Sequence, residues 1–426
     1  MTTTGAPPST GGAGRRVRDL VRAGPKLGDL GHLAVAQLGP MPIYFLLNLV
    51  TAATLDPGRR GMATLVVGSG AVGATLLFGS MHVGAVLAVR AGDAAAFRRV
   101  AWVTAGISLA CASAAAAVLA ADPAGWGLYT GPALAQILAG LALMVPLLFL
   151  ARTVQGLGQA RAYRQLMLLQ ASLYAAGAVV CLLALGRRSP LSVTIPWLLA
   201  MLVTVVAGAV RLRRLLRPVR WSPGGAGVTA VGASLAAHSG SVTQQVAYKG
   251  DLFLLGWFAP AAAVGLYTLS SSIAEVVWVV PEVLALSVFA DEQVRSASDW
   301  RAVVARRVRQ AVACSAVAMA AVFAGGAVLL LFFLPAYRGS LPLLAILMPG
   351  VVAGAAARVI LASLTARDAR HLLRLAAAAN LTISCLYLPG VALWGVRGAA
   401  VASTLIYLLQ LLVARRLWTR AVTCTT

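Results

Sequence analysis

The sequence predicts an all-α polytopic membrane protein with about 12 transmembrane helices in two six-helix lobes and both termini in the cytoplasm. Three observations lead to this fold class: long apolar stretches, arginines in alternate gaps between them, and two pairs of similar segments six stretches apart. Each apolar stretch has about 20 residues or more, the length of a helix that crosses a bilayer. The twelve stretches lie near 32–54, 62–88, 99–121, 131–151, 166–186, 191–210, 230–257, 263–288, 309–334, 341–364, 371–393 and 397–415.

The cations divide unequally between the two sides of the predicted membrane. Most arginines lie in the N-terminal tail, in the gaps after even-numbered spans, or in the C-terminal tail. Because short cytoplasmic loops carry an excess of Lys and Arg, the arginine-rich side is expected to be cytoplasmic. A multi-pass protein of the cell (plasma) membrane is therefore predicted. The opposite side receives only Arg59, Arg60, Arg187, Arg188, Arg338 and Arg397.

Composition narrows the function classes. The chain is 60% hydrophobic and 11% charged, with a formal net charge of +23. In a soluble protein such a charge would suggest a nucleic-acid partner. Here the cations sit in short loops, where they hold the topology and contact anionic headgroups, so membrane lipids are the expected partners and nucleic acid is not. The five cysteines are scattered singly, so neither a metal nor another cofactor is predicted.

A basic linker at the middle of the chain separates six spans from six. The predicted division is a basic tail at 1–28, a first lobe at 29–212, a linker at 213–228, a second lobe at 229–416 and a C-terminal tail at 417–426. DPGRRGMATL (56–65) resembles APAAAVGLYTL (259–269), and the segment that begins at Arg152 resembles the one that begins at Arg358. Chance similarity in an Arg- and Ala-rich chain is the alternative to duplication. Duplicated halves would share one orientation, and folds of this type place the substrate between the halves.

Several segments resemble a known family. The sequence YKGDLFLLGWFAPAAAVGLYTLSSSIAEVVWVVPEVLALSVFADE (248–292) is similar to spans seven and eight of polysaccharide-transporter flippases. These Wzx-type oligosaccharide flippases belong to the multidrug/oligosaccharidyl-lipid/polysaccharide (MOP) exporter superfamily. DPGRRG (56–61), QGLGQARAY (155–163) and WGVRGAAVASTLIYLL (394–409) also look similar. The resemblance implies a MOP/MATE-like fold and a role in moving lipid-linked oligosaccharide for cell-envelope polysaccharide biosynthesis.

Ionisable residues inside the spans are candidate functional residues, because a charge in the middle of a bilayer is costly. At a rise of ~1.5 Å per residue, Lys249 and Asp251 fall in the outer third of the membrane and Glu275 near its midplane. Glu282 and Arg358 share a depth in the inner third. Pairs between Glu282 and Arg358, and between Lys249 and either Glu275 or Asp251, are therefore geometrically possible.

Each candidate has a structural interpretation beside the functional one. The charges either line a water-filled cavity for substrate or only pair between neighbouring helices. Gln244 and Gln245 either share the face of Lys249 or bond across helices. Arg152, at the inner end of the fourth span, either collects a pyrophosphate together with Arg358 or only sets topology. The spans of the first half hold only uncharged polar groups, so the charges of the cleft are expected from the second lobe.

These observations predict a transporter and not an enzyme. The chain has no catalytic constellation and no G-x-x-x-x-G-K-[ST] motif, so ATP is not the direct energy source. The expected function is alternating-access flipping of a lipid-linked oligosaccharide or related glycolipid, with glycosyltransferases or a polymerase of the same pathway as partners. One alternative is a proton- or sodium-coupled exporter of drugs or small metabolites, in which Asp251 or Glu275 carries the ion. A third is a non-transporting scaffold of an envelope-assembly complex.

Overall fold

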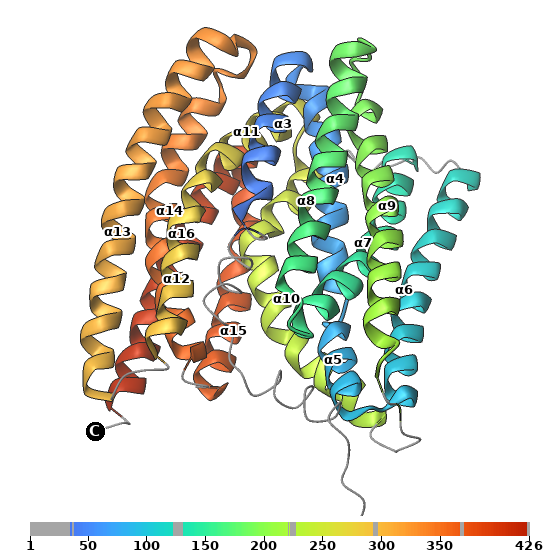
Figure 1. The fold of residues 1–426 in the computed structure, drawn as a ribbon. Coiled ribbons are helices and arrows are strands. Elements are labelled where there is room, and N and C mark those ends of the chain that lie inside the picture. Colours follow the sequence, from blue (N-terminus) through green and yellow to red (C-terminus); the bar gives the residue numbers. More distant parts are fainter. Residues whose placement is uncertain are drawn as a thin grey trace, which may run out of the picture.

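The protein is a bundle of long helices whose axes are roughly aligned (Figure 1). The computed structural model describes Val35, residues 38–121, 131–219, Trp221, 227–292, 297–366 and 370–423. Within these ranges, nine helices are long and apolar enough to cross a membrane, and further apolar helices are shorter. The chain is therefore a multi-pass membrane protein, as the hydropathy pattern predicts.

The first half of the chain forms six segments that lie close to the predicted spans. Their helices are α3 (Pro40–Thr54), α4 (Pro57–Leu77) with α5 (Met81–Ala91), α6 (Ala94–Ala121), α7 (Gly131–Gly156), α8 (Ala160–Val179) with a π-helical turn (Val180–Ala184), and α9 (Leu191–Leu216). The N-terminal tail and the region around Asp122 lie outside the described residues.

The second half also forms six segments. They consist of α10 (Gly227–Phe258), α11 (Ala261–Glu275) continued by a 3-10 turn η2 (Val276–Trp278) and α12 (Val279–Glu292), α13 (Ala297–Val328) with a π-helical turn η3 (Leu329–Phe333), α14 (Ser340–Ala366), α15 (Arg370–Ser384) and α16 (Tyr387–Thr423). Gly395, at φ 55°, bends α16, so its first turns continue the eleventh segment. A short turn η4 (Pro335–Tyr337) precedes α14.

Three of the predicted spans are interrupted in the structure. The second span is interrupted at Gly79 and Ser80, whose φ values are 63° and 50°. The eighth passes through η2, and the eleventh turns between Ser384 and Tyr387. The third and ninth helices begin earlier than predicted, because hydropathy detects only the apolar part of a helix, whereas polar turns beyond the apolar core remain helical.

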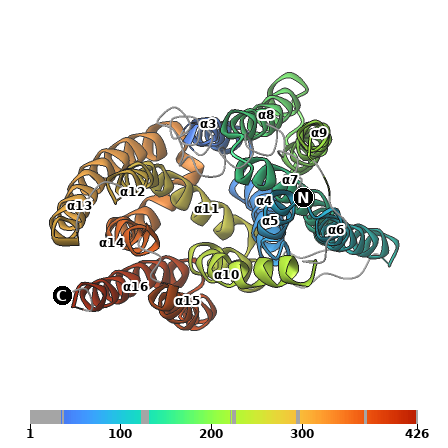
Figure 2. The same cartoon turned by 60° about the horizontal axis from the view of Figure 1, so that its bottom comes forward.

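The helices of the two halves pair in the same pattern. In the first half, α4 and α6 pack on α7, α7 packs on α9, and α8 lies against both α3 and α9. In the second half, α11 and α13 pack on α14, α14 packs on α16, and α15 lies against both α10 and α16. Figure 2 shows the two groups on opposite sides, with α10 and α11 between them. This repeated pairing is the one that duplication of a six-span unit would produce.

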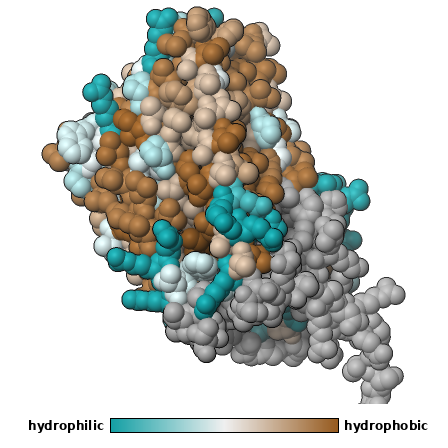
Figure 3. Space-filling view, turned by 90° about the vertical axis from the view of Figure 1, so that its left-hand side faces the viewer, coloured by the Kyte–Doolittle hydropathy of each residue, from teal (hydrophilic) through white to brown (hydrophobic). Residues whose placement is uncertain are grey.

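Large apolar side chains cover the outside of the bundle. Val317, Phe332 and Phe333, in α13 and the turn after it, are 72%, 76% and 71% exposed. Figure 3 shows mainly hydrophobic residues over this side of the molecule, with many of the hydrophilic ones towards its lower end. Such a surface suits contact with acyl chains and would be unfavourable in water.

The N-terminal ends of α4 and α11 pack directly against each other. A Cβ atom on Gly61 would collide with the carbonyl oxygen of Ala261, and one on Gly265 would collide with the carbonyl oxygen of Pro57. Only glycine permits this backbone approach. The two contacting segments are the similar segments 56–65 and 259–269, so the repeat places its matching motifs against each other.

A tryptophan fills a space that two glycines leave in the first half. The ring of Trp197, on α9, occupies the positions that Cβ atoms on Gly70 of α4 and Gly140 of α7 would take. Trp278 lies against Gly354 in the same way in the second half. Small residues of this kind let transmembrane helices approach closely.

We expect Gly265→Ala to destabilise the protein, because the added methyl group meets a backbone carbonyl that has no room to move. Overpacking of this kind costs about 2 kcal/mol of unfolding free energy, which a lower melting temperature of the detergent-solubilised protein would report. Gly106→Ala is the matched control, since nothing lies within 4 Å of a Cβ at that position. An equal effect of both substitutions would contradict the tight α4–α11 contact.

Candidate functional site

A cavity of about 470 Å³ lies between the two halves of the molecule. Helices α3, α4, α7, α8 and α9 contribute its first-half lining, and α10 and α11 contribute the rest. Its size falls within the range of ligand pockets, roughly 300–1,000 Å³. Its polar and aromatic lining residues are Tyr44, Asn48, Thr51, Arg60, Thr64, Gln170, Tyr174, Trp197, Gln245, Lys249, Asp251, Tyr267, Thr268, Ser271, Ser272 and Glu275.

Lys249 of α10 and Glu275 of α11 form an ion pair in the cavity wall. The Nζ of Lys249 donates to Oε1 of Glu275, and the Ser271 hydroxyl donates to the same oxygen at 2.8 Å. Each of the two charged side chains is 38% exposed, so neither is shut off from the cavity. The depth argument named this pairing as one of two for Lys249, and the structure selects Glu275. The pair neutralises itself and remains able to contact a cargo.

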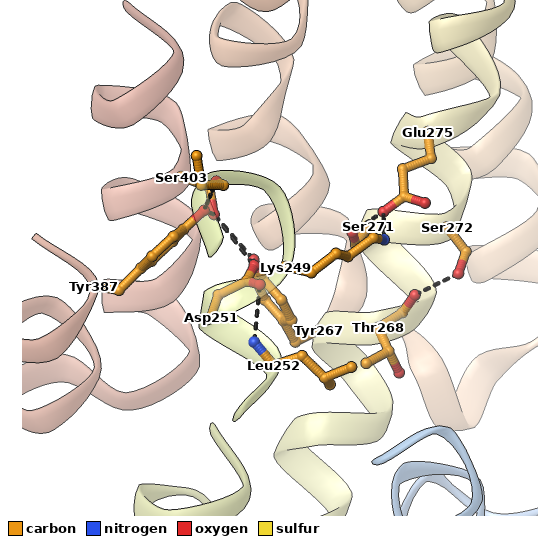
Figure 4. Close-up of polar contacts among 11 residues, drawn as sticks. Lys249, Asp251, Leu252, Tyr267, Thr268, Ser271, Ser272, Glu275, Tyr387 and Ser403 are labelled. Carbon is orange, nitrogen blue, oxygen red and sulfur yellow. Dashed lines mark hydrogen bonds and ion pairs between the residues drawn. The ribbon is translucent and has the colours of Figure 1, made fainter. Parts of the chain in front are cut away.

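Asp251, two residues after Lys249 on α10, contacts the hydroxyl groups of neighbouring helices (Figure 4). It is 5% exposed and accepts hydrogen bonds from the hydroxyl of Tyr267 and from the backbone N–H of Leu252 at 2.8 Å. Ser403 Oγ lies 3.4 Å from the Asp251 carboxylate and 3.3 Å from the hydroxyl of Tyr387. Its single proton therefore serves one acceptor at a time.

This arrangement suits a proton or a single small cation at Asp251. A carboxylate ringed by hydroxyls supplies hard oxygen donors, and the hydroxyls can reorient when the carboxylate gains or loses its proton. Among the described residues, no group of three or more His, Cys, Asp and Glu side chains is placed to bind a metal ion. The site therefore differs from a multi-carboxylate metal site.

Arg358 and Glu282 form the other predicted pair, but they are not among the residues that line this cavity. Helix α14 packs on α12 within the second half, which places the pair inside one lobe. The guanidinium carbon of Arg358 lies 4.8 Å from the ring centroid of Tyr248 and 4.3 Å from that of Trp278. Arg358 therefore does not line this cavity, and its contact with a substrate stays a prediction. It thus pairs with Glu282 beside an aromatic cluster of Tyr248 and Trp278.

Arg152 and Gln244 also do not belong to the lining of this cavity. Arg152 donates to the side chain of Gln155 at 3.0 Å and lies 5.8 Å from the ring centroid of Tyr163. Gln244 is exposed, whereas its neighbour Gln245 lines the cavity. Successive residues of a helix point about 100° apart, and the rotation of α10 turns Gln245 and not Gln244 towards this cavity.

Arg60 is the charged residue of the cavity lining that the sequence interpretation missed. The alternation of charge assigned it to an outer loop, and in the first half only Arg152, at the inner end of a span, was a charged candidate. The structure places it inside α4 with only 1% of its surface exposed. Helix α4 begins at Pro57, two residues after Leu55 caps α3, so Arg60 is already a turn inside the helix. The very short connection between α3 and α4 was the sequence feature from which the helical position of Arg60 could have been predicted.

Several solved structures have this fold. An inward-facing conformation of a multidrug resistance MATE family transporter of the MOP superfamily matches with a TM-score of 0.72 and 15% identity, covering 92% of this chain and 98% of that one. An outward-facing conformation of such a transporter matches with a TM-score of 0.59 and 15% identity, covering 95% and 98%. Neither a protein-family model nor a curated protein matches the sequence.

A third structure comes from Pyrococcus furiosus and is described as a MOP superfamily transporter whose binding pocket of reverse polarity suggests a different function. It matches with a TM-score of 0.59 and 16% identity, covering 96% of this chain and 98% of that one. The coverage is nearly complete in every case. The chain therefore has the MATE-like fold of about 12 helices that the sequence predicts.

We expect Arg358→Met to destabilise the protein more than the double variant Arg358→Met/Glu282→Met. The single change leaves Glu282 without its cation inside the bundle, whereas the double change removes both charges. Because Glu282 is 31% exposed, the difference should be moderate, about 2 kcal/mol of unfolding free energy. Melting curves of the purified variants measure it. A double variant as unstable as the single one would show that lost packing, and not the unpaired charge, dominates.

Proposed function

We propose that the protein transports a lipid-linked oligosaccharide, or a related glycolipid, from the inner to the outer leaflet of the cytoplasmic membrane by alternating access. The observation that carries this proposal is the cavity between the two halves, to which both halves contribute polar and charged groups. Transporters built from parallel repeats bind their substrate at such an interface. The MATE-like fold and the resemblance to polysaccharide flippases support the same mechanism.

The chemistry of the lining favours a sugar-containing cargo. Amide groups of Asn48, Gln170 and Gln245 can both donate and accept hydrogen bonds, as sugar hydroxyls do. The hydroxyls of threonine and serine on α4 and α11 add to this set. The rings of Tyr44 and Tyr174, with centroids 6.2 Å apart, present apolar faces to the C–H side of a sugar and hydroxyls to its polar side. An apolar drug would leave most of these groups without partners.

The cargo would enter from the cytoplasmic side, where its synthesis takes place. In this proposal both termini and most arginines face the cytoplasm, and Arg152 at the inner end of α7 attracts the anionic pyrophosphate. Glycosyltransferases or the polymerase of the same pathway are the proposed partners. Membrane lipids hold the bundle through its exposed apolar surface.

One observation favours a second candidate, a cation-coupled exporter of drugs or small metabolites. Asp251 is a buried carboxylate that accepts from the hydroxyl of Tyr267 and the backbone N–H of Leu252, with the hydroxyl of Ser403 at 3.4 Å. A group of this kind is suited to bind a proton or sodium ion in one state of a transport cycle and to release it in the other. In that function the ion gradient would drive export, and the cavity would bind a soluble cargo.

We expect Gln245→Ala to slow leaflet exchange of a labelled lipid-linked oligosaccharide in proteoliposomes about fivefold, which corresponds to one hydrogen bond of about 1 kcal/mol. Gln244→Ala is the matched control, because this neighbouring side chain is not part of the cavity lining. Equal rates for the two variants, at equal reconstituted amounts, would count against this cavity as the route of the cargo.

The two candidate functions also differ in their dependence on a gradient. We expect the wild-type protein to accelerate leaflet exchange without an imposed ion gradient, and to take up no cationic dye when a proton or sodium gradient is applied. Dye uptake that depends on the gradient and disappears in Asp251→Asn, together with no leaflet exchange, would replace the flippase by the exporter.

A further inference from the structure

Arg60 is a buried cation whose bonds all go to neutral groups. Its Nη1 donates to the carbonyl oxygen of Gly265 at 2.7 Å and to the hydroxyl of Thr268 at 3.1 Å, and its Nη2 donates to the side-chain oxygen of Asn48 at 3.0 Å. Its Nε has no hydrogen-bond partner among the described residues. No described carboxylate forms an ion pair with it, and its neighbour Arg59 pairs with Asp56 instead.

The nearest carboxylate along the chain, Asp56, is occupied at the N-terminus of α4, where it pairs with the side chain of Arg59. Arg60 lies in the first turns of α4, and the first turn of α11 packs against it through Gly61 and Gly265. The N-terminus of α4 is capped by the Asp56 carboxylate, which accepts from the backbone N–H of Arg59 at 3.0 Å, whereas the N-terminus of α11 has no side-chain cap and adds a partial positive charge beside the guanidinium. A buried charge normally has a counter-ion, because burial without one is unfavourable. Among the described residues, Arg60 has no such counter-ion of its own.

The same contacts connect the two halves of the molecule. Gly265 and Thr268 belong to α11, whereas Arg60 and Asn48 belong to α4 and α3. Nearby, the hydroxyl of Tyr337 donates to the carbonyl oxygen of Leu55 at 2.9 Å, and the guanidinium of Arg60 lies 5.8 Å from the ring centroid of Tyr337. These bonds close the end of the cavity that the arginine pattern predicts to be extracellular. The better match to an inward-facing MATE structure agrees with closure there.

We propose that Arg60 is both the anion-binding residue of the cavity and the latch of its outer end. This inference rests on the proposed function. In it, the guanidinium of Arg60 binds the phosphate or pyrophosphate oxygens of the cargo. Arginine binds phosphate through paired, charge-assisted hydrogen bonds that are stronger than its bonds to neutral oxygens. An arriving anion would therefore replace Gly265 and Thr268 as acceptors. Loading of the cavity would release the contacts that hold the outer end closed.

Spin labels at exposed positions of the two halves can test this directly. Arg187→Cys, between α8 and α9, and Arg338→Cys, before α14, place one label on each half at the outer end of a cysteine-free full chain in proteoliposomes. The probes are an isoprenoid pyrophosphate, the isoprenoid alcohol of the same length, and inorganic pyrophosphate. Pulsed electron paramagnetic resonance then reports the distance between the labels.

We expect the isoprenoid pyrophosphate to lengthen this distance and the alcohol to leave it unchanged. A response to inorganic pyrophosphate as well would assign the site to a soluble anion, and its absence would assign the site to a lipid headgroup; either outcome supports an anion site. Arg60→Met should weaken the response roughly tenfold or more in half-saturating concentration. Arg59→Met is the matched control, since this exposed neighbour should leave the response intact.

Thr268→Val keeps the test valid if Arg60→Met fails to fold. It removes one acceptor on the opposite half without changing any charge, so the labels should lie farther apart before ligand is added and still respond to pyrophosphate. A wild-type response in Arg60→Met, or an unchanged resting distance in Thr268→Val, would overturn the inference.

Leaflet exchange measured in the same vesicles separates the two proposals. Exchange without any distance response would remove the latch and leave the flippase standing. A distance response to pyrophosphate without exchange would remove the flippase and leave the anion latch standing.

Discussion

The close packing of α4 against α11 at Gly61 and Gly265 determines where the two halves of the molecule meet. Because neither position has a side chain, the two backbones touch, and the halves join at one end of the bundle. Beyond this contact the lining of the cavity begins, with Arg60 and Thr268 on its wall. Lys249 and Glu275 follow deeper along α10 and α11. The contact thus fixes which side chains of the two halves face each other.

Lipid imposes a second condition, because a backbone N–H or carbonyl in the apolar layer must find its partner within the helix or on a neighbour. The helices satisfy it almost throughout, and their serines and threonines add bonds to their own backbone, as Thr104 does to the carbonyl oxygen of Val100 at 2.9 Å. Breaks occur where glycine or a polar turn permits them. Gly79, Ser80 and Gly395 adopt positive φ values, which end one stretch of helix and redirect the next.

Much of this fold could be predicted from the sequence because the features that determine it are read along consecutive residues. The apolar length needed to cross a bilayer and the arginine bias of the loops are both properties of consecutive residues. The depth of a residue in the membrane also follows from its position along the helix. The pairing of Glu275 with Lys249 and that of Glu282 with Arg358 could therefore be predicted. The shared motif at 56–65 and 259–269 pointed to the repeat, and in the structure these two segments touch.

The rest depends on how helices rotate and pack, which a hydropathy pattern does not contain. Arg60 was predicted to be a loop residue because it follows a span by a few positions. A very short turn instead places it within α4, where it contacts α11. Arg358 has the right depth for the cavity but faces α12, inside its own half. Gln244 and Gln245 are adjacent and chemically identical, and only the rotation of α10 decides that the second of them lines the cavity.

The ring of Trp197 lies in the space that Gly70 and Gly140 leave open, and it also forms part of the cavity wall. Residues on three helices thus share one volume, so the effects of changing them should not add. A larger residue at either glycine is tolerable only after the tryptophan has become smaller, whereas a smaller residue at 197 first leaves a void. Substitutions at these positions are therefore tolerated only when the change at Trp197 comes before the changes at the two glycines. Relatives with a different cargo would be expected to differ at all three sites together.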